Sequence, residues 1–312
     1  MRTSTEPVLV VHGGAGSIPD EMVEAYLAGV RAALDAGWVI LEAGGSAVAA
    51  VEAAIAVMED DGSFDAGRGS VLNQDGRVQL DAMIMDGASL AAGGIGAVET
   101  VRHPIRVARA VMERSPHVYF AGSGAERFAA EHGFAPIDNS ALVTPRERRR
   151  FEDARQSAAT GQDVRAGDRT TGLPTHDTVG AVALDRGGDL AAGTSTGGIS
   201  DKPVGRIGDS SIIGSGCYAD NESAAVSCTG EGEPIMRLVL GKWTVDRVAA
   251  GETPQAAARA AIERLGTRLG GRGGLILLDH DGHVGIAANT PRMAWALRTP
   301  AGADAGTEVG LG

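Results

Sequence analysis

The chain is organised around one stretch, Thr175-His176-Asp177-Thr178-Val179-Gly180-Ala181-Val182-Ala183-Leu184-Asp185. From Thr178 onward the stretch is short and apolar, a pattern typical of a buried β-strand. The strand opens on a small hydroxyl residue directly after an acidic one. We therefore predict a strand over residues 178–185. We also hypothesise that the chain is cut between Asp177 and Thr178, which makes Thr178 a new N-terminus.

The segment before this strand has a different composition. Residues 136–177 are rich in Arg, Glu, Asp, Gln, Ser, Thr and Gly, and only residues 144–158 have a pattern compatible with a helix. This composition predicts a mobile linker. A linker of that length is uncommon inside a compact domain, and cleavage at its end would explain it.

The beginning of the chain alternates apolar and glycine-rich segments. Residues 8–11 predict a strand, and the glycine run 12–16 that follows lacks the spacing of a phosphate-binding loop. We interpret this run as a tight turn under an active site. The Ala-rich periodicity of residues 20–56 is broken by Gly44-Gly45, which predicts two helices, with Ser46 as the cap of the second.

The remaining elements fall on both sides of Thr178. The pattern predicts strands over 78–87, 89–99, 117–120, 189–195, 223–229, 274–279, 283–287 and 293–297, and helices over 103–114, 123–132, 233–250 and 253–268. Strands and helices thus occur together in both halves of the chain. This order favours stacked sheets with helices outside over a parallel βαβ array.

The bulk composition excludes several classes of protein. A hydrophobic content of 43% predicts a packed globular core, and a net charge of -12 argues against nucleic-acid and anionic-membrane partners. Two cysteines are too few for a disulfide framework. The N-terminal residues lack the features of a signal peptide, and no apolar run reaches transmembrane length. We therefore expect a cytoplasmic protein whose partner is a small-molecule substrate.

Six blocks of sequence resemble one family of hydrolases. In order and spacing they are similar to the plant-type (type III) asparaginases and isoaspartyl peptidases and, more distantly, to the glycosylasparaginases, all of which are N-terminal nucleophile (Ntn) hydrolases. Each block alone is a weak signal, whereas six in order are a strong one. The blocks are His12–Gly16, Ala66–Gly87, Thr178-Val179-Gly180, Thr194–Gly198, Gly205–Ser210 and Thr229–Gly232.

The resemblance implies a fold and an assembly. The expected fold is α+β, a four-layer αββα sandwich of two stacked, mainly antiparallel sheets with helices on both outer faces. Residues 1–312 would form a single Ntn-hydrolase domain, processed into an α subunit (1–177) and a β subunit (178–312). The resemblance further implies a homodimer of αβ heterodimers. It implies no cofactor other than a structural sodium ion.

Cleavage before Thr178 would supply the chemistry that a threonine nucleophile needs. A threonine hydroxyl is a poor nucleophile at neutral pH and requires a base beside it. A free α-amine has a pKa of about 7.7–8.0, so part of the population is unprotonated near neutral pH and can accept the hydroxyl proton. Nucleophile and base then belong to one residue. Without the surrounding blocks, Thr178 would be an ordinary threonine at the start of a strand.

The resemblance assigns three further residues to the reacting centre. Thr196 matches a second threonine that supports the nucleophile by hydrogen bonding. Thr229 and Gly230 match an oxyanion-hole pair, in which a hydroxyl and a backbone N–H point at the tetrahedral oxygen. Loss of one such donor typically lowers the rate by about 10²–10³.

Substrate recognition is predicted for Arg206, Asp209 and Gly232. A guanidinium group binds a carboxylate through two parallel hydrogen bonds, and a carboxylate three residues later suits an α-ammonium group. Arg206 and Asp209 would thus bind the two charged ends of an aspartyl unit and leave its β-carbonyl for Thr178. Gly232 matches a wall of the substrate pocket. A surface ion pair between Arg206 and Asp209 is the alternative.

The loop 58–70 resembles the sodium-binding loop of the family, in which backbone carbonyl groups hold the ion. The matching positions are Met58, Glu59, Asp61, Phe64, Ala66 and Arg68. One departure is Asp65, where the family usually has Asn at a position near the nucleophile. A carboxylate there would alter the cleavage rate or the pKa of the Thr178 amine through its negative charge. Ser211, where Pro is common, is a minor departure.

Three functions are compatible with these residues. The first is a self-cleaving amidohydrolase acting on L-asparagine and β-aspartyl (isoaspartyl) dipeptides to give L-aspartate. The second is a glycosylasparaginase-type amidase, which His176-Asp177-Thr178 also resembles, although Gly197-Gly198 favours the first. The third is a glycine-rich small-molecule binding protein that never cleaves itself. The sequence does not rank asparagine against isoaspartyl peptides.

Overall fold

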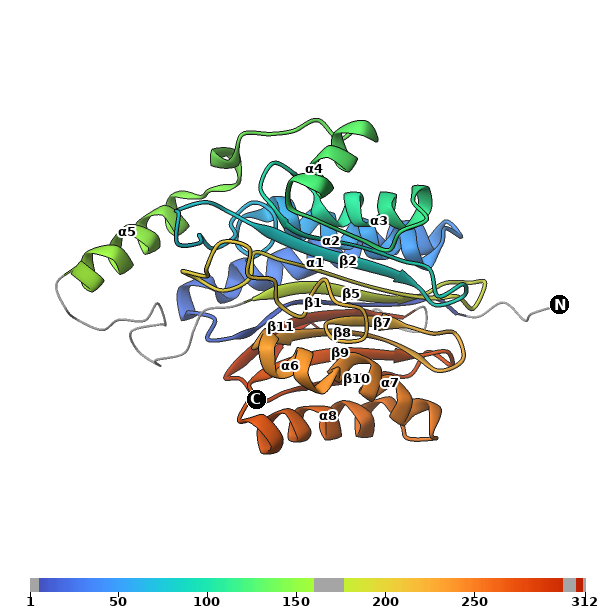
Figure 1. Cartoon of the computed structure of the whole chain (residues 1–312). Coiled ribbons are helices and arrows are strands. Elements are labelled where there is room, and N and C mark those ends of the chain that lie inside the picture. Colours follow the sequence, from blue (N-terminus) through green and yellow to red (C-terminus); the bar gives the residue numbers. More distant parts are fainter. Residues whose placement is uncertain (1–5, 160–176, 300–306, 311–312) are drawn as a thin grey trace.

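The computed structural model describes residues 6–159, 177–299 and 307–310. These residues form a mixed α+β fold with two sheets (Figure 1). The larger sheet has the strand order β12-β11-β1-β5-β6-β2-β3-β4, and the smaller has the order β10-β9-β8-β7. Neighbouring strands are antiparallel in both, except for the parallel pair β3 and β4.

The elements have the following bounds. The strands are β1 (Val8–Gly16), β2 (Leu80–Asp86), β3 (Ala92–Val98), β4 (Tyr119–Ala121), β5 (Thr178–Leu184), β6 (Leu190–Thr196), β7 (Cys217–Ala219), β8 (Ala224–Gly230), β9 (Gly273–Asp279), β10 (Val284–Ala288), β11 (Arg292–Arg298) and β12 (Thr307–Gly310). The helices are η1 (Asp20–Met22), α1 (Val23–Glu42), α2 (Ala47–Asp61), α3 (Pro104–Arg114), α4 (Gly122–Glu131), η2 (Asn139–Leu142), α5 (Pro145–Ala159), α6 (Gly232–Leu238), α7 (Leu240–Ala249) and α8 (Pro254–Leu269).

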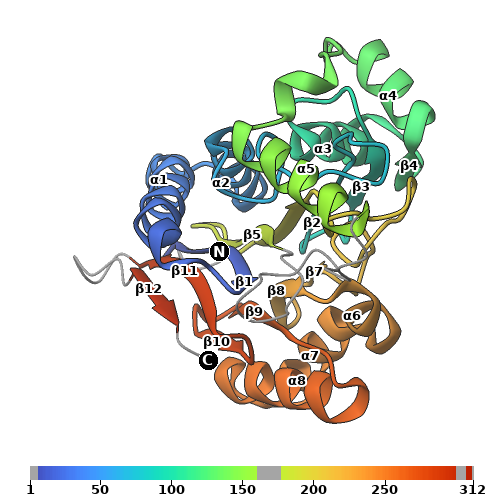
Figure 2. The same ribbon diagram turned by 90° about the vertical axis from the view of Figure 1, so that its left-hand side faces the viewer.

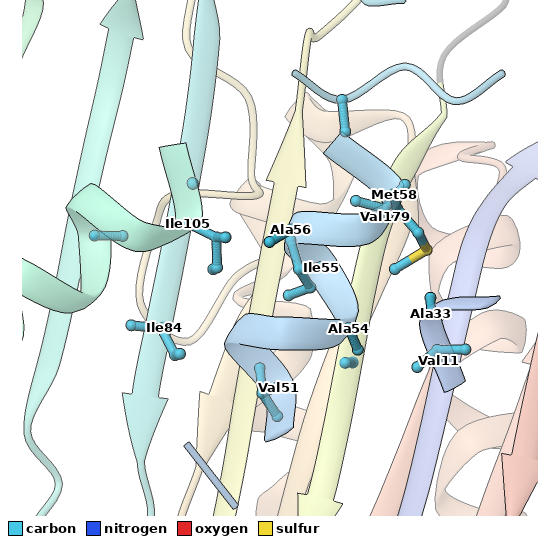
Figure 3. Packing of buried hydrophobic residues seen from close by; sticks show 14 of the residues in the cluster. Val11, Ala33, Val51, Ala54, Ile55, Ala56, Met58, Ile84, Ile105 and Val179 are labelled. Atoms are coloured by element: carbon cyan, nitrogen blue, oxygen red, sulfur yellow. The ribbon is translucent and has the colours of Figure 1, made fainter. Parts of the chain in front are cut away.

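Three clusters of buried apolar side chains hold the elements together. One lies between the larger sheet and α1, α2 and α3; Figure 3 shows part of it, including Val51, Ile55 and Val179. A second cluster contains residues of both sheets, such as Val182 of β5 and Ile276 of β9. The third joins the smaller sheet to α7 and α8 (Figure 2). Because β5 contributes to both of the first two clusters, all seven of its residues are buried.

Local signals in the sequence set the ends of α2. Ser46 has an extended backbone, and its hydroxyl accepts a hydrogen bond from the Ala49 N–H at 3.3 Å, as expected of an N-cap. Gly62 ends the helix in the left-handed conformation with φ 80°, which glycine adopts without strain. The predicted break at Gly44-Gly45 and the predicted cap at Ser46 are both confirmed.

Two predicted elements differ from the structure. Residues 12–16 are not a turn, because β1 continues to Gly16 with a register shift between His12 and Ala15 against β11. The predicted helix 233–250 is divided at Val239, whose φ of 49° and ψ of 50° are left-handed. The short strands β7 and β12 had no clear signal in the sequence.

The predicted linker 136–177 is partly structured. Residues 139–142 form η2, and Leu142 is buried in the apolar cluster between the larger sheet and α1, α2 and α3. The one helix predicted in this segment is confirmed as α5. Residues 160–176 lie outside the described residues. Over the described ranges, no helix is long and apolar enough to cross a membrane.

Candidate active site

Three strands bring three threonines together. Thr178 opens β5 and lies opposite Thr196, the last residue of β6. Thr229 lies near the end of β8, in the smaller sheet, and its Oγ1 accepts a hydrogen bond from the Thr178 backbone N–H at 3.3 Å. All three side chains are buried. The site therefore depends on the contact between the two sheets.

The peptide bond between Asp177 and Thr178 is hydrogen-bonded on both sides. Its N–H donates to Thr229, and its carbonyl oxygen accepts from Thr196 Oγ1 at 3.2 Å. The Thr196 hydroxyl is fixed in turn, because it accepts from the Gly198 N–H at 2.9 Å. A hydroxyl donor at a carbonyl oxygen polarises that carbonyl and stabilises a negative charge on it.

Ser210 is the nearest hydroxyl partner of Thr178. The two Oγ atoms are 3.2 Å apart. The Ser210 backbone is held by Thr194 of β6, whose Oγ1 donates to the Ser210 carbonyl at 2.5 Å. The Thr178 hydroxyl thus has the Ser210 hydroxyl as a polar partner in a buried environment. Ser210 belongs to the Gly205–Ser210 block, but its hydroxyl was not among the predicted site residues.

Gly230 follows Thr229 and has a φ of 134°. A Cβ at this position would collide with the Arg272 carbonyl and with Gly273 of β9. Both the conformation and the close backbone approach therefore require glycine. The Thr229 hydroxyl also accepts from the Ala15 N–H at 3.3 Å, so β1 contributes to the same centre.

Arg206, Asp209 and Gly232 lie together as predicted, but Arg206 is not paired with Asp209. Its Nε and Nη2 donate to the two carboxylate oxygens of Glu233, each at 2.9 Å. A Cβ at Gly232 would lie 3.0 Å from both Arg206 Nη2 and Asp209 Oδ1. Glu233, the second residue of α6, was not among the predicted site residues.

Asp209 is buried, and its Oδ2 has no hydrogen-bond partner among the described residues. Burial raises the pKa of the Asp209 carboxyl to about 7, although Arg206 acts in the opposite direction. A buried carboxylate without a full set of partners is costly. An α-ammonium group would supply the missing charge and donors.

Asp65 also lies near Thr196. Its carbonyl accepts from the Gly197 N–H at 2.9 Å, and Gly197 directly follows Thr196. Its Oδ1 accepts from the Val71 N–H at 2.9 Å, while Oδ2 has no partner within the described part of the chain. Burial raises the pKa of Asp65 to about 8, and the negative charge of Asp177 acts in the same direction.

The loop after α2 folds back on the end of that helix. The Arg68 N–H donates to the Glu59 carbonyl at 2.7 Å. This bond brings the loop back to the last turn of the helix, where C=O groups lack helical partners and the helix dipole is negative. Hard cations prefer such oxygen ligands. The Glu59 side chain is engaged elsewhere, since it accepts from Ser195 Oγ and the Ile105 N–H. A helix end of this kind suits a cation, and the sodium site at this loop stays a prediction.

Two other buried polar groups near the centre were missed. Lys202 is fully buried, donates to the Gln79 carbonyl at 2.8 Å, and has its pKa lowered by burial. His12 Nε2 lies 2.7 Å from Ser227 Oγ, and burial lowers the pKa of the ring to about 3, so it is neutral. His12 belongs to the predicted glycine run, but only the pairing of β1 with β5 places it near Thr178.

Comparison with known proteins identifies the family. The sequence model of a protein family described as Asparaginase matches residues 5–307. This chain belongs to the asparaginase family. Three of its relatives are named isoaspartyl peptidase/L-asparaginase. The Homo sapiens protein is 43% identical over 291 residues, which are 93% of this chain and 92% of the relative. The Xenopus laevis protein is 42% identical over 292 residues (93% and 92%), and the Bos taurus protein 42% over 305 residues (97% and 97%).

Proposed function

We propose that this asparaginase-family chain is a self-cleaving amidohydrolase that converts L-asparagine and β-aspartyl dipeptides to L-aspartate. The observation that carries the proposal is the convergence of Thr178, Thr196 and Thr229 on the single peptide bond before Thr178. The names of the relatives support the two substrates. They also favour this function over a glycosylasparaginase-type activity and over a binding protein without catalysis.

Self-cleavage begins with attack of the Thr178 hydroxyl on the Asp177 carbonyl carbon. A bond from Oγ1 to that carbon forms, as the hydroxyl gives up the proton that the leaving nitrogen takes up. Thr196 Oγ1 donates to the carbonyl oxygen, where negative charge develops. The C–N bond then breaks, and the nitrogen takes up a proton to become the α-amine of Thr178. Water hydrolyses the resulting ester, which releases the Asp177 carboxyl group and restores the Thr178 hydroxyl.

Substrate hydrolysis would follow the same pattern with the new amine as base. The α-amine of Thr178 accepts the hydroxyl proton while Oγ1 attacks the β-carbonyl of the substrate. Thr229 and Gly230 donate to the oxygen of the tetrahedral intermediate. The amine leaving group, ammonia or an amino acid, departs with that proton. Water then hydrolyses the aspartyl ester of Thr178 and yields L-aspartate.

Arg206 and Asp209 would bind the ends of the aspartyl unit. With Nε and Nη2 engaged by Glu233, the guanidinium group presents its Nη1 and Nη2 edge, which lies beside Gly208 and Gly232. This edge suits an α-carboxylate bidentately. The buried Asp209 carboxylate would take the α-ammonium group.

The finer points of fold and assembly belong to the same proposal. The packing of α1 and α2 on the larger sheet and of α7 and α8 on the smaller supports the four-layer αββα sandwich of an Ntn hydrolase. We propose one such domain over residues 1–312, processed into chains 1–177 and 178–312, and a homodimer of the resulting heterodimers. Cys217 and Cys228 are both buried and free, which suits the cytoplasm.

A sodium ion would be held by backbone carbonyl groups of Met58, Glu59, Asp61, Phe64, Ala66 and Arg68. Bound there, it would supply a fixed positive charge that holds the loop against α2. Its role would be structural, since the loop carries Asp65 and packs Phe64 against α1. A higher melting temperature in sodium than in an equal concentration of tetramethylammonium would support this site, and equal melting temperatures would contradict it.

Denaturing electrophoresis tests the central proposal. The purified chain should separate into two fragments, and N-terminal sequencing of the smaller should begin at Thr178. The Thr178→Ala variant should remain intact and inactive. The matured protein should release aspartate from L-asparagine and β-Asp-Leu faster than from a glycosylated asparagine. A single persistent band together with no release of aspartate would contradict the proposal, and preference for the glycosylated substrate would favour the glycosylasparaginase-type activity.

A further inference from the structure

A tyrosine on α1 reaches the residue on the acyl side of the proposed cut. The Tyr26 hydroxyl donates to Asp177 Oδ2 at 2.5 Å. Tyr26 is 5% exposed, and its ring packs edge-to-face against Phe64 with the centroids 5.0 Å apart. Phe64 is itself fully buried. The hydroxyl of Tyr26 is therefore fixed in position by the packing of its ring.

The other side of the Asp177 side chain is limited by backbone. Gly14 of β1 has a φ of 111°, and a Cβ there would lie 2.6 Å from both Cβ and Oδ1 of Asp177. Asp177 thus has its side chain between the Tyr26 hydroxyl and the Gly14 backbone, while its carbonyl oxygen accepts from Thr196. A rotation of the Asp177 backbone that moved the carbonyl away from Thr196 would also move the carboxylate away from Tyr26.

We propose that Tyr26 is a positioning residue for self-cleavage, which anchors the Asp177 carboxylate and so holds the adjoining carbonyl carbon in place for attack by Thr178. The inference rests on the proposed function, because it concerns the maturation of the same nucleophile. Burial and the adjacent Asp177 charge raise the pKa of Tyr26. The phenol consequently keeps its proton, and its ability to donate, throughout the neutral pH range.

The anchor would act on maturation and not on turnover. After cleavage Asp177 is a chain end with no covalent link to Thr178. Tyr26 then has no path through this contact to the nucleophile or the substrate. A hydrogen bond to a charged group is strong enough to change a rate constant by about tenfold to a hundredfold. Removing it should therefore slow self-cleavage by at least about tenfold and leave the matured enzyme unchanged.

The test follows self-cleavage in full-length chains made in a cell-free translation reaction, with samples stopped at intervals and separated by denaturing electrophoresis. The variants are Tyr26→Phe, Asp177→Ala and the double variant. Tyr218→Phe is the matched control, since Tyr218 is a partly buried tyrosine whose ring lies under the Lys242 ammonium group, and none of its contacts in the described part of the chain is with Asp177. Melting temperatures of the same variants in a Thr178→Ala background show whether the uncleaved fold is retained.

We expect Tyr26→Phe to cleave at least about tenfold more slowly than the unchanged chain, and Tyr218→Phe to cleave at the unchanged rate. In the Asp177→Ala background, Tyr26→Phe should have no further effect, since its partner is absent. Fully matured Tyr26→Phe should have unchanged kcat and KM for L-asparagine. Equal rates for Tyr26→Phe and the unchanged chain, or additive effects in the double variant, would overturn the inference. Failure of the unchanged chain to cleave would instead overturn the proposed function.

Discussion

Arg206 and Glu233 are joined by two parallel hydrogen bonds, from Nε and Nη2 to the two carboxylate oxygens, each 2.9 Å long. The Arg206 side chain is 13% exposed, whereas that of Glu233 is 58% exposed. The bidentate geometry fixes the plane of the guanidinium group. In the proposed substrate complex, Glu233 would therefore decide which edge of Arg206 faces the substrate carboxylate.

Replacing Glu233 should weaken substrate binding. In Glu233→Ala the guanidinium group is free to rotate, so it must be ordered when the substrate binds. We expect KM for L-asparagine to rise about tenfold, with kcat changed less than threefold. Steady-state kinetics of the matured enzyme measure both. Glu222→Gln, on an exposed turn, is the control. An unchanged KM would show that Glu233 does not orient Arg206 for binding.

Asp65→Asn should accelerate self-cleavage. The Asp65 carboxylate lies beside Gly197, next to Thr196, whose hydroxyl donates to the Asp177 carbonyl oxygen and would stabilise negative charge there. A second negative charge nearby opposes that stabilisation. The amide keeps an oxygen for the Val71 N–H and removes the charge. At pH 9 the Asp65 carboxyl, with a pKa of about 8, is ionised. We expect self-cleavage to be about threefold to tenfold faster in the variant at this pH, as measured by denaturing electrophoresis of timed samples. A slower Asp65→Asn would mean that the carboxylate assists cleavage.

Asp209→Asn should change how stability depends on pH. Burial raises the pKa of Asp209 from 3.8 to about 7. Because the unfolded chain ionises this carboxyl at a lower pH than the folded chain does, the folded chain loses stability as pH rises from about 4 through about 7. An asparagine side chain does not titrate, so the variant does not lose stability in this way. The variant should therefore gain stability relative to the parent by up to about 4 kcal/mol above pH 8.

Urea unfolding at pH 4 to 8.5 measures this difference, with both chains carrying Thr178→Ala so that they stay uncleaved. At pH 4 the two free energies of unfolding should be closest. A constant difference across the range would indicate that Asp209 has an ordinary pKa in the folded chain.

Val239→Asn should stabilise the fold. Val239 is β-branched, 47% exposed, and has a φ of 49° between α6 and α7. That conformation is unfavourable for a β-branched residue but is accepted by Asn. We expect a gain of about 1 kcal/mol in the free energy of unfolding. Val204→Asn, an exposed valine without a left-handed backbone, should give no gain. Equal effects of the two changes would exclude backbone strain as the cause.

Local sequence signals predicted most of the elements. The strand from Thr178, the cap at Ser46 and the helix of residues 145–159 follow from periodicity and capping, which act over a few residues. The break at Val239 could not be predicted in this way. Its left-handed backbone runs against the preference of valine, so it must be imposed by the packing of α6 and α7.

The sequence by itself indicated the family and predicted the position of the nucleophile and the residue types of the site, because these predictions depend on blocks of neighbouring residues in a fixed order. Only the tertiary structure decided which residues are hydrogen-bonded to one another at the site. Thr229 reaches Thr178 across the contact between two sheets, Glu233 and not Asp209 engages Arg206, and Tyr26 of α1 anchors Asp177. These contacts join residues 27 to 151 positions apart, and such separations leave no periodic signal in the chain. Thr178 is thus specified locally, but its environment is specified by the fold.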